Sequence, residues 1–249
     1  MRLTRVYADA LLTLGSSLEL SDSAGAHLVR VLRLTVGQKI TVFDGRGCEM
    51  DAHISVIRGT RVTVVLEGLR HSVTESALSL TLLQSISRAE RMDWTIQKAT
   101  ELGVRRIVPL KTEHTIVRLD AQAGEKKRAH WAAIAAAACE QCGRAVVPSV
   151  DSPITLPEYL ARLRQDDPSS AIKLALDPES SVRLHALGGL SGGASLLVGP
   201  EGGLSANELR LALNNGFTGL RLGPRIMRTE TAAIATLAAL QTLYGDFAL

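Results

Sequence analysis

Residues 196–208 read LLVGPEGGLSANE, and this stretch decides how the second half of the chain folds. Residues 195–198 are β-formers, which indicates a short buried strand. Ser205 and Glu208 have the spacing of a capping box, so a helix is expected to begin there. Three glycines and a proline lie between the strand and the helix, and glycines allow backbone N–H groups to approach a ligand closely. The stretch therefore predicts a strand, a ligand-binding loop and a helix in succession.

The same pattern recurs about twenty residues later with different letters. Residues 217–222 indicate a strand, residues 223–228 (GPRIMR) a loop, and residues 229–244 a long apolar helix. Two such units side by side form a pocket at the carboxyl ends of their strands. Either loop alone would be an ordinary turn of an α/β fold. Together they place two carboxylates, Glu201 and Glu230, between apolar elements, which favours a functional site.

The rest of the chain divides into a β-rich part and an α/β part. Short strands at close spacing in the first 70 residues indicate a small barrel or another small β domain. After a polar linker near residues 71–77, strands and helices alternate, which is typical of an α/β domain. We therefore predict domains at 1–72 and 73–249. The expected strands are 39–43, 49–57, 61–67, 78–86, 106–110 and 172–176, and the expected helices are 21–33, 90–102, 121–142 and 156–164.

Composition narrows the possible classes of function. The 249 residues are 46% apolar and 21% charged, with a formal net charge of +3 that permits nucleic-acid binding without requiring it. Aromatic residues make up only 3%, which argues against a surface that stacks many RNA bases. No apolar run has the length of a membrane span, and the three cysteines suit a reducing compartment, so we expect a cytoplasmic protein.

Several common catalytic motifs are missing from the sequence. No Gly-x-Gly-x-x-Gly follows a strand, and there is no phosphate loop, no His-Glu-x-x-His and no Gly-x-Ser-x-Gly, so dinucleotide, nucleotide, metal and serine-hydrolase chemistry are disfavoured. Cys139 and Cys142 end a helix, where the dipole does not activate a thiol, and no second pair completes a zinc site. Glu140 and Arg144 are four residues apart near Gly143. Such a pair is usually a surface ion pair, but its place at a helix end suggests a pocket.

Two longer segments carry a resemblance to a known family. Residues 198–203 (VGPEGG) and 222–232 (LGPRIMRTETA) resemble the C-terminal signature of the SPOUT methyltransferases, and more closely the RsmE family, which methylates N3 of a uridine in 16S ribosomal RNA. Residues 27–33 (HLVRVLR), 97–104 (QKATELGV) and 138–144 (ACEQCGR) are also similar to segments of that family. The resemblance therefore covers essentially the whole chain.

The resemblance implies an architecture, a cofactor and partners. It implies a PUA-like barrel followed by an α/β domain with a trefoil knot, formed by the segments around 198–203 and 222–231. It also implies a homodimer that binds S-adenosylmethionine in the knot and acts on 16S rRNA of the small ribosomal subunit, without a metal or a membrane. The implied cofactor-binding residues are Leu176, Val198, Gly199, Pro200, Glu201, Gly202, Gly203, Leu222, Gly223, Ile226, Met227, Arg228 and Thr231.

The chemistry of the implied reaction selects the candidate catalytic residues. The proton on uridine N3 must leave before or during methyl transfer, so a base or a stabiliser of the uridine anion is needed. We expect Arg228 to stabilise the developing charge or to grip a phosphate, Glu140 or Glu230 to act as the base, and Glu201 or Glu230 to favour a cationic methyl donor. Glu230 also lies in the first turn of a helix, where any carboxylate is favourable. The candidates for binding RNA are Arg30, Arg33, Arg88, Gln141 and Arg144.

Two other functions remain open at this point. One is an RNA-binding assembly factor without catalytic activity, although a pure binding protein would not need both glycine loops. The other is a SPOUT enzyme that acts on tRNA. The chain also departs from the family at His114, where the family tends to have arginine, so a contact that an arginine would make there is not implied.

Overall fold

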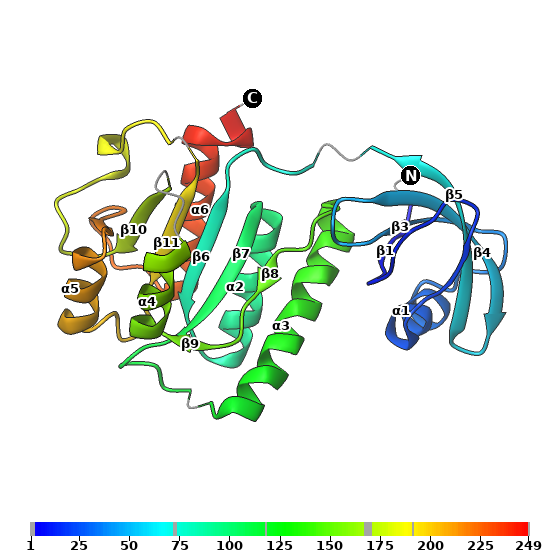
Figure 1. The fold of residues 1–249 in the computed structure, drawn as a ribbon, viewed down its shortest axis with the longest axis horizontal. Coiled ribbons are helices and arrows are strands. Elements are labelled where there is room, and N and C mark those ends of the chain that lie inside the picture. Colours follow the sequence, from blue (N-terminus) through cyan, green and yellow to red (C-terminus); the bar gives the residue numbers. More distant parts are fainter. Residues whose placement is uncertain (1–2, 72–73, 118, 167–170, 191, 249) are drawn as a thin grey trace. The chain divides into compact units, whose positions relative to one another are not determined.

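The structure, a computed structural model, describes residues 3–71, 74–117, 119–166, 171–190 and 192–248 (Figure 1). The chain forms two compact units. The first comprises Met1–Glu75 and Ala136–Val147, and the second comprises Ser76–Ala135 and Pro148–Leu249. The segment 136–147, which the predicted division placed in the C-terminal domain, thus packs with the amino-terminal part of the chain.

The first unit is built on a five-stranded sheet in the order β1-β3-β4-β5-β2. β1 pairs in parallel with β3, and the other neighbours pair antiparallel. Alternate side chains of the long strands are buried, for example Val62, Val64 and Leu66, as expected for a sheet with one face in the core. The strands are β1 (Arg5–Tyr7), β2 (Ser17–Glu19), β3 (Lys39–Phe43), β4 (Glu49–Arg58) and β5 (Arg61–Arg70).

The helix of the first unit differs from the single helix expected over residues 21–33. The α-helical part, α1, spans only Asp22–Ala26, and the π-helical turn η1 follows at His27–Val31. Ser21 caps α1, because its side chain accepts a hydrogen bond from the backbone N of Ala24. The helical segment ends before Arg33, because the φ of 54° at that residue is incompatible with a right-handed helix.

The second unit contains a seven-stranded sheet in which every pair of neighbours is parallel. Its strand order is β12-β10-β11-β6-β7-β8, with β9 also pairing with β7. The alternation of strands and helices predicted this α/β arrangement, and the structure confirms it. The strands are β6 (Leu80–Ser85), β7 (Val104–Lys111), β8 (Ser149–Val150), β9 (Ile154–Thr155), β10 (Ile172–Leu176), β11 (Ala194–Val198) and β12 (Thr218–Leu220).

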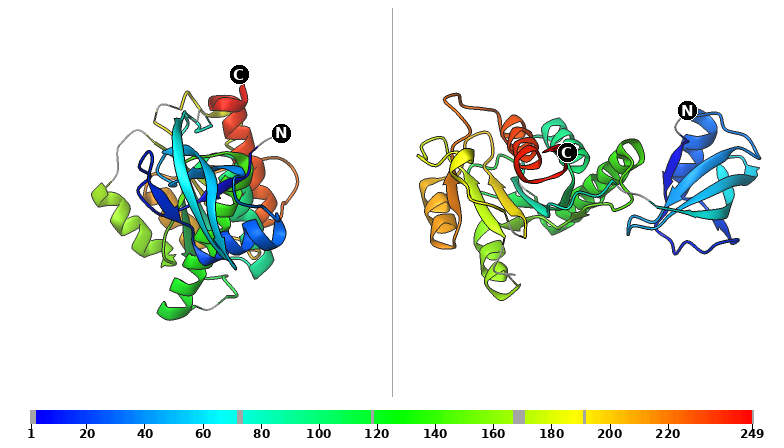
Figure 2. Two further views of the ribbon diagram at one scale, coloured as in Figure 1. Left: turned by 90° about the vertical axis from the view of Figure 1, so that its right-hand side faces the viewer. Right: turned by 90° about the horizontal axis from the view of Figure 1, so that it is seen from above.

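Helices cover both faces of this sheet (Figures 1 and 2). α4 and α5 pack over one face, where Leu83, Val108 and Leu197 form a buried cluster with residues of both helices. α2 and α6 pack against each other and against the strands of the sheet. The helices are α2 (Ala89–Glu101), α3 (Ala121–Cys142), α4 (Leu156–Asp166), α5 (Ala206–Asn214) and α6 (Thr229–Tyr244), with 3-10 turns η2 (Leu184–Ala186) and η3 (Asp246–Ala248). Among the described residues, no helix is both long and apolar enough to cross a membrane.

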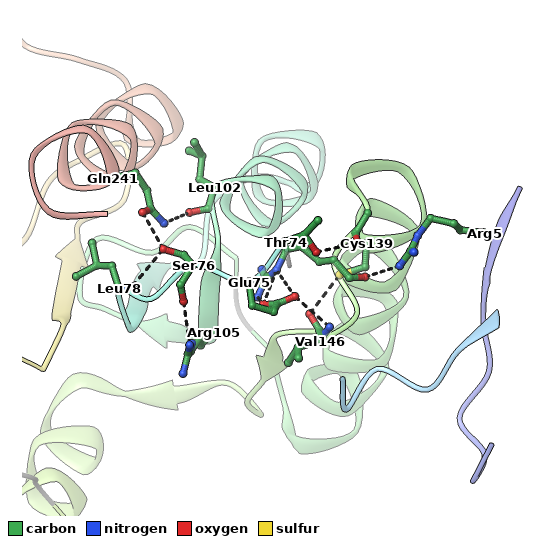
Figure 3. Close-up of polar contacts among 12 residues, drawn as sticks. Arg5, Thr74, Glu75, Ser76, Leu78, Leu102, Arg105, Cys139, Val146 and Gln241 are labelled. Carbon is green, nitrogen blue, oxygen red and sulfur yellow. Dashed lines mark hydrogen bonds and ion pairs between the residues drawn. The ribbon is translucent and has the colours of Figure 1, made fainter. Parts of the chain in front are cut away.

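The far end of α6 is fixed by buried polar contacts (Figure 3). The side-chain amide of Gln241 donates to the carbonyl of Leu102 at 2.8 Å and accepts from Ser76 Oγ at 3.0 Å. A glycine is needed at position 103, because a Cβ there would lie only 2.8 Å from Gln241 Nε2. These contacts fix the carboxyl-terminal end of α6, and Thr229 lies at its amino-terminal end.

Candidate active site

Two loops leave the same edge of the parallel sheet. β11 and β12 both pair in parallel with β10, so the loops at 199–205 and 221–228 emerge at the carboxyl ends of their strands. The first loop leads into α5 and the second into α6. Both strand–loop–helix units were predicted from the sequence, and the structure confirms them. Open α/β sheets bind ligands at this edge.

The first loop ends in the predicted capping box. Ser205 Oγ accepts from the backbone N of Glu208 at 3.2 Å, and Glu208 Oε2 accepts from the backbone N of Ser205 at 3.0 Å. The Glu208 side chain is buried, and its other oxygen accepts from the backbone N of Glu113 at 2.9 Å. Both carboxylate oxygens are therefore used, and the start of α5 is tied to the segment that follows β7.

A cavity of about 440 Å³ lies between the two loops. Its size is typical of a site for a small molecule or cofactor. Of the cofactor-binding candidates, only Gly202 and Thr231 do not line it. The candidates that do are Leu176, Val198, Gly199, Pro200, Glu201, Gly203, Leu222, Gly223, Ile226, Met227 and Arg228. Arg225, in the predicted loop 223–228, lines it too, whereas sequence reasoning missed Arg91, Asp177, Pro178, Leu204, Leu209, Leu220, Arg221, Thr229 and Ala232.

Two glycines of the first loop are required for different reasons. A Cβ on Gly199 would lie 2.8 Å from the backbone N of Leu204 and 3.0 Å from the carbonyl carbon of Gly203. Gly203 has a φ of +73°, which a residue with a side chain adopts only with strain. The loop therefore folds tightly back on itself.

The first residue of α6 joins the two loops. Thr229 Oγ1 donates to the carbonyl of Gly199 at 2.6 Å and accepts from Gln84 Nε2 at 2.9 Å. Gln84 lies near the carboxyl end of β6, and both side chains are buried. Local sequence patterns gave no sign of Gln84, since its partner is 145 residues away.

Arg91 of α2 lies at the cavity and connects a carboxylate of the first loop, Glu201, with one in the first turn of α6, Glu230. Its Nη1 is 3.0 Å from Glu201 Oε1, and its Nε is 3.8 Å from Glu230 Oε1. One signal in the sequence would have drawn attention to it. A basic residue in the first turn of a helix is unfavourable for the helix dipole, so it suggests a nearby carboxylate.

Two predicted catalytic residues at the start of α6, Arg228 and Glu230, have contrasting environments. Arg228 is the N-cap residue of α6 and is exposed, as is Arg225. The side chain of Glu230 is only 14% exposed, and its Oε2 is buried without a hydrogen-bond partner among the described residues. Ile226 is 86% exposed at the cavity and is available to cover a ligand. The start of α6 therefore combines an accessible cation with a carboxylate that has unused hydrogen-bonding capacity.

Glu140 belongs to the first unit, near the end of α3. Its Oε1 accepts from the backbone N of Tyr7 at 2.9 Å. Burial raises the pKa of the Glu140 carboxyl, and the hydrogen bond from Tyr7 and the charges of His27 and Arg5 oppose that shift. Within this unit the carboxylate therefore holds β1 against the end of α3.

Arg144 has a structural role, because its side chain is buried and paired with Glu75, which is labelled in Figure 3. α3 ends at Cys142 and Gly143 has a φ of +97°, so the helical spacing assumed for Glu140 and Arg144 does not continue to residue 144. Arg144 is only 3% exposed and its Nη2 lies 2.9 Å from Glu75 Oε2. This placement leaves the guanidinium little access to RNA.

The other candidates for RNA binding are exposed. Arg30 and Arg33 lie in and just after η1 in the first unit, and Gln141 is near the end of α3. Arg88 is the N-cap residue of α2 in the second unit. The described residues contain no group of three or more His, Cys, Asp or Glu side chains that could hold a metal ion.

Comparisons with known proteins match both units of the chain. Residues 74–241 match the family described as RNA methyltransferase domain, and residues 20–67 match the RNA methyltransferase PUA domain. Proteins named ribosomal RNA small subunit methyltransferase E are similar over most of their length. The one from Buchnera aphidicola of Schizaphis graminum is 32% identical, covering 98% of each chain, and the one from Bacillus subtilis is 31% identical, covering 88% of this chain and 89% of the relative.

Solved structures resemble the chain over nearly its whole length. A ribosomal RNA small subunit methyltransferase E from Neisseria gonorrhoeae, bound to S-adenosyl methionine, is 40% identical with a TM-score of 0.93, and the match covers 99% of this chain and 100% of that one. A putative methyltransferase from Legionella pneumophila, in complex with the bound cofactor SAM, is 39% identical with the same TM-score and coverage.

Proposed function

The chain belongs to the RNA methyltransferase family that includes ribosomal RNA small subunit methyltransferase E, and from this premise we propose that it methylates N3 of a specific uridine in 16S rRNA. The methyl donor is S-adenosylmethionine. The observation that carries the proposal is the cavity between the two loops, which eleven of the thirteen residues implied for the cofactor line.

The residues of the cavity fit this donor. Gly199, Gly203 and Gly223 leave backbone exposed to a ligand, and Leu176, Leu204 and several neighbours provide apolar walls for a nucleoside. The donor supplies an electrophilic methyl group on a positively charged sulfur. Glu201 lies at the cavity, and a carboxylate favours a cationic ligand over a neutral one. Positioning of donor and acceptor provides much of the acceleration in such a displacement.

Arg228 and Glu230 are assigned to the acceptor. Glu230 accepts the N3 proton of the uracil through its carboxylate, since the side chain is 14% exposed and has one oxygen without a hydrogen-bond partner among the described residues. Arg228, which is exposed and lies two residues before Glu230, stabilises the negative charge that develops on the uracil oxygens. Since N3 lies on the pairing edge, the target base must be unpaired or flipped out. Glu140 is the alternative base.

Exposed arginines of both units are assigned to the RNA. Arg30 and Arg33 of the amino-terminal unit and Arg88 at the start of α2 contact phosphates, and Gln141 provides a further polar contact. The matching PUA domain supports this role for the amino-terminal unit. We assign 1–72, together with the segment 136–147 that packs with it, to RNA binding, and the rest of 73–249 to cofactor binding and catalysis.

Finer features of the architecture follow the family resemblance. We propose that the segments around 198–203 and 222–231 form a trefoil knot, and that the five-stranded sheet closes into a PUA-like barrel. We also propose that the enzyme is a homodimer and acts in the cytoplasm, where ribosomal subunits are found.

The substrate is tested with methyl-labelled donor and separated acceptors. Small ribosomal subunits from a strain without this activity, protein-free 16S rRNA and total tRNA are incubated with the purified protein. We expect label in 16S rRNA and no label in tRNA. Label in tRNA would support a SPOUT enzyme of different specificity. Binding to subunits with no label in any RNA would support an assembly factor.

A further inference from the structure

His114 lies in a rigid turn directly after β7. The backbone N of Thr115 donates to the carbonyl of Thr112 at 3.0 Å, and Thr115 Oγ1 accepts from the backbone N of Thr112 at 3.0 Å. The two threonine hydroxyls are 2.8 Å apart. The neighbouring Glu113 donates its backbone N–H to the buried carboxylate of Glu208. The turn is therefore fixed both internally and to the start of α5.

The imidazole of His114 contacts the first glycine loop. Its Nδ1 lies 3.1 Å from the carbonyl oxygen of Gly202 and 3.0 Å from that of Gly203. Both partners are acceptors only, so Nδ1 carries the hydrogen in this arrangement. A single N–H is thus shared between two successive carbonyls of the loop, which fixes the orientation of two peptide planes.

The absence of a side chain at Gly202 leaves room for His114. A Cβ on Gly202 would lie 3.1 Å from the Cβ of His114, closer than side chains normally approach. Gly202 does not line the cavity, whereas its neighbours Glu201 and Gly203 do. The missing side chain at 202 therefore serves the contact with His114, which lies on the loop but not among the residues that line the cavity.

We propose that His114 is a positioning residue for the methyl donor: it holds the first glycine loop in the conformation that forms one wall of the cavity. The proposal rests on the proposed function for the identity of the ligand. The contact by which His114 holds the loop is present without the methyl donor, so it can be tested separately. In the loop, the backbone N of Gly203 donates to the carbonyl of Pro200 at 2.9 Å, and this turn is what His114 stabilises.

Three variants separate the N–H donor from the bulk of the ring. His114→Ala removes both, and His114→Asn keeps an N–H donor near the position of Nδ1. His185→Ala, at an exposed histidine of η2, is the matched control. We expect His114→Ala to raise the Kd and KM for S-adenosylmethionine about threefold to tenfold, with kcat at saturating donor within about twofold. His114→Asn and His185→Ala should remain close to the unsubstituted protein.

A double-mutant cycle tests the contact with Gly202. Gly202→Ala should weaken donor binding because its methyl group collides with His114. In the double variant with His114→Gly, which lacks the Cβ that the added methyl group would approach to 3.1 Å, the collision is absent, so the second substitution should cost less than it does in the unsubstituted protein. Strictly additive losses would contradict the proposed contact.

Hydrogen exchange distinguishes this inference from the proposed function. Without donor, His114→Ala should speed exchange of the Gly203 amide at least threefold, and His114→Asn should not. Unchanged exchange in His114→Ala, or equal loss of donor affinity in His114→Asn and His114→Ala, would overturn the role of His114. Faster exchange in a protein that binds no S-adenosylmethionine would instead refute the proposed function and leave the holding of the loop intact.

Discussion

Thr229 Oγ1 donates a 2.6 Å hydrogen bond to the carbonyl of Gly199, so the first residue of the last helix fixes the first residue of the glycine loop. The two residues come from the two halves of the signature and are 30 residues apart in the sequence. Gln84 donates to the same hydroxyl from β6. The cavity is therefore held by a short buried chain of hydrogen bonds, and it is not formed by loops that are independent of each other.

Replacing Thr229 tests that chain. Thr229→Val keeps the shape of the side chain but leaves the Gly199 carbonyl without its buried donor, so we expect a loss of about 1–3 kcal/mol in the free energy of unfolding. Donor binding should weaken in parallel. Thr229→Ser keeps the hydroxyl and is the control. Urea unfolding and calorimetric donor titration provide the two readouts, and equal behaviour of the two variants would contradict the account.

Arg91 is expected to set the charge of the cavity. It neutralises Glu201 and lies near Glu230, so Arg91→Met leaves negative charge uncompensated where the donor binds. The donor is a cation and its product, S-adenosylhomocysteine, is neutral at sulfur. The ratio of product Kd to donor Kd should therefore rise about twofold to fivefold, a modest change because the pair is partly exposed. Arg91→Lys should keep the original ratio, and an unchanged ratio in Arg91→Met at low salt would count against this role.

Two glycines at the cavity should respond differently to alanine. At Gly199 a Cβ would lie 2.8 Å from a backbone nitrogen, so Gly199→Ala should distort the loop and lower both stability and donor affinity. At Gly223 a Cβ would meet nothing within 4 Å, so Gly223→Ala should leave the melting temperature unchanged. Because Gly223 lines the cavity, donor affinity should still fall. Thermal melting with and without donor separates these effects, and equal melting temperatures for both variants would exclude the distortion at Gly199.

Glu230 is expected to act on the acceptor and not on the donor. Glu230→Gln removes the proton acceptor while keeping the volume of the side chain, so kcat should fall about a hundredfold or more. Donor Kd should change less than about threefold, because the carboxylate does not line the cavity. Glu90→Gln, an exposed first-turn residue of α2, is the control. If kcat survives in Glu230→Gln, the base lies elsewhere and Glu140 is the next candidate.

Glu140 should make stability depend on pH. Burial raises its pKa in the folded protein above the value near 4.3 in the unfolded chain, so the folded state binds this proton more tightly. Its contribution is therefore fully present at low pH and is lost as the pH rises through the folded pKa.

Glu140→Gln removes this titration and keeps an oxygen that can accept from Tyr7. The stability of the unsubstituted protein relative to Glu140→Gln, measured by urea unfolding, should fall as the pH rises from about 4.3, the unfolded pKa, through the folded pKa. The exposed Glu19 of β2 provides the control, Glu19→Gln. A difference that is flat or grows with pH would show that burial does not dominate the titration of Glu140.

Several elements that depend on local sequence patterns were predicted correctly. Residues 195–198 and the Ser205–Glu208 box appear as expected, and the helix expected over 229–244 coincides with α6 at Thr229–Tyr244. The short strands β1 and β2 were missed, because three residues carry too little periodicity to be recognised.

The contacts that support the site could not be predicted from local sequence patterns, because the two partners of each contact are distant in sequence. Gln84 lies 145 residues from Thr229, Arg91 lies 110 from Glu201, and His114 lies 88 from Gly202. Arg144 illustrates the opposite error. Its spacing from Glu140 suggested a helical pair, yet the chain leaves the helix at Gly143 and Arg144 pairs with Glu75.

Nucleoside analysis of treated small subunits determines whether the protein methylates N3 of a uridine in 16S rRNA. Small subunits from a strain without this activity are treated with the protein and S-adenosylmethionine, and the digested 16S rRNA is examined by mass spectrometry. We expect one 3-methyluridine per 16S rRNA, formed more slowly by about a hundredfold or more when Glu230→Gln replaces the unsubstituted protein. A methyl group on another atom or another nucleoside, or no methylation by a protein that binds the donor, would contradict the proposed function.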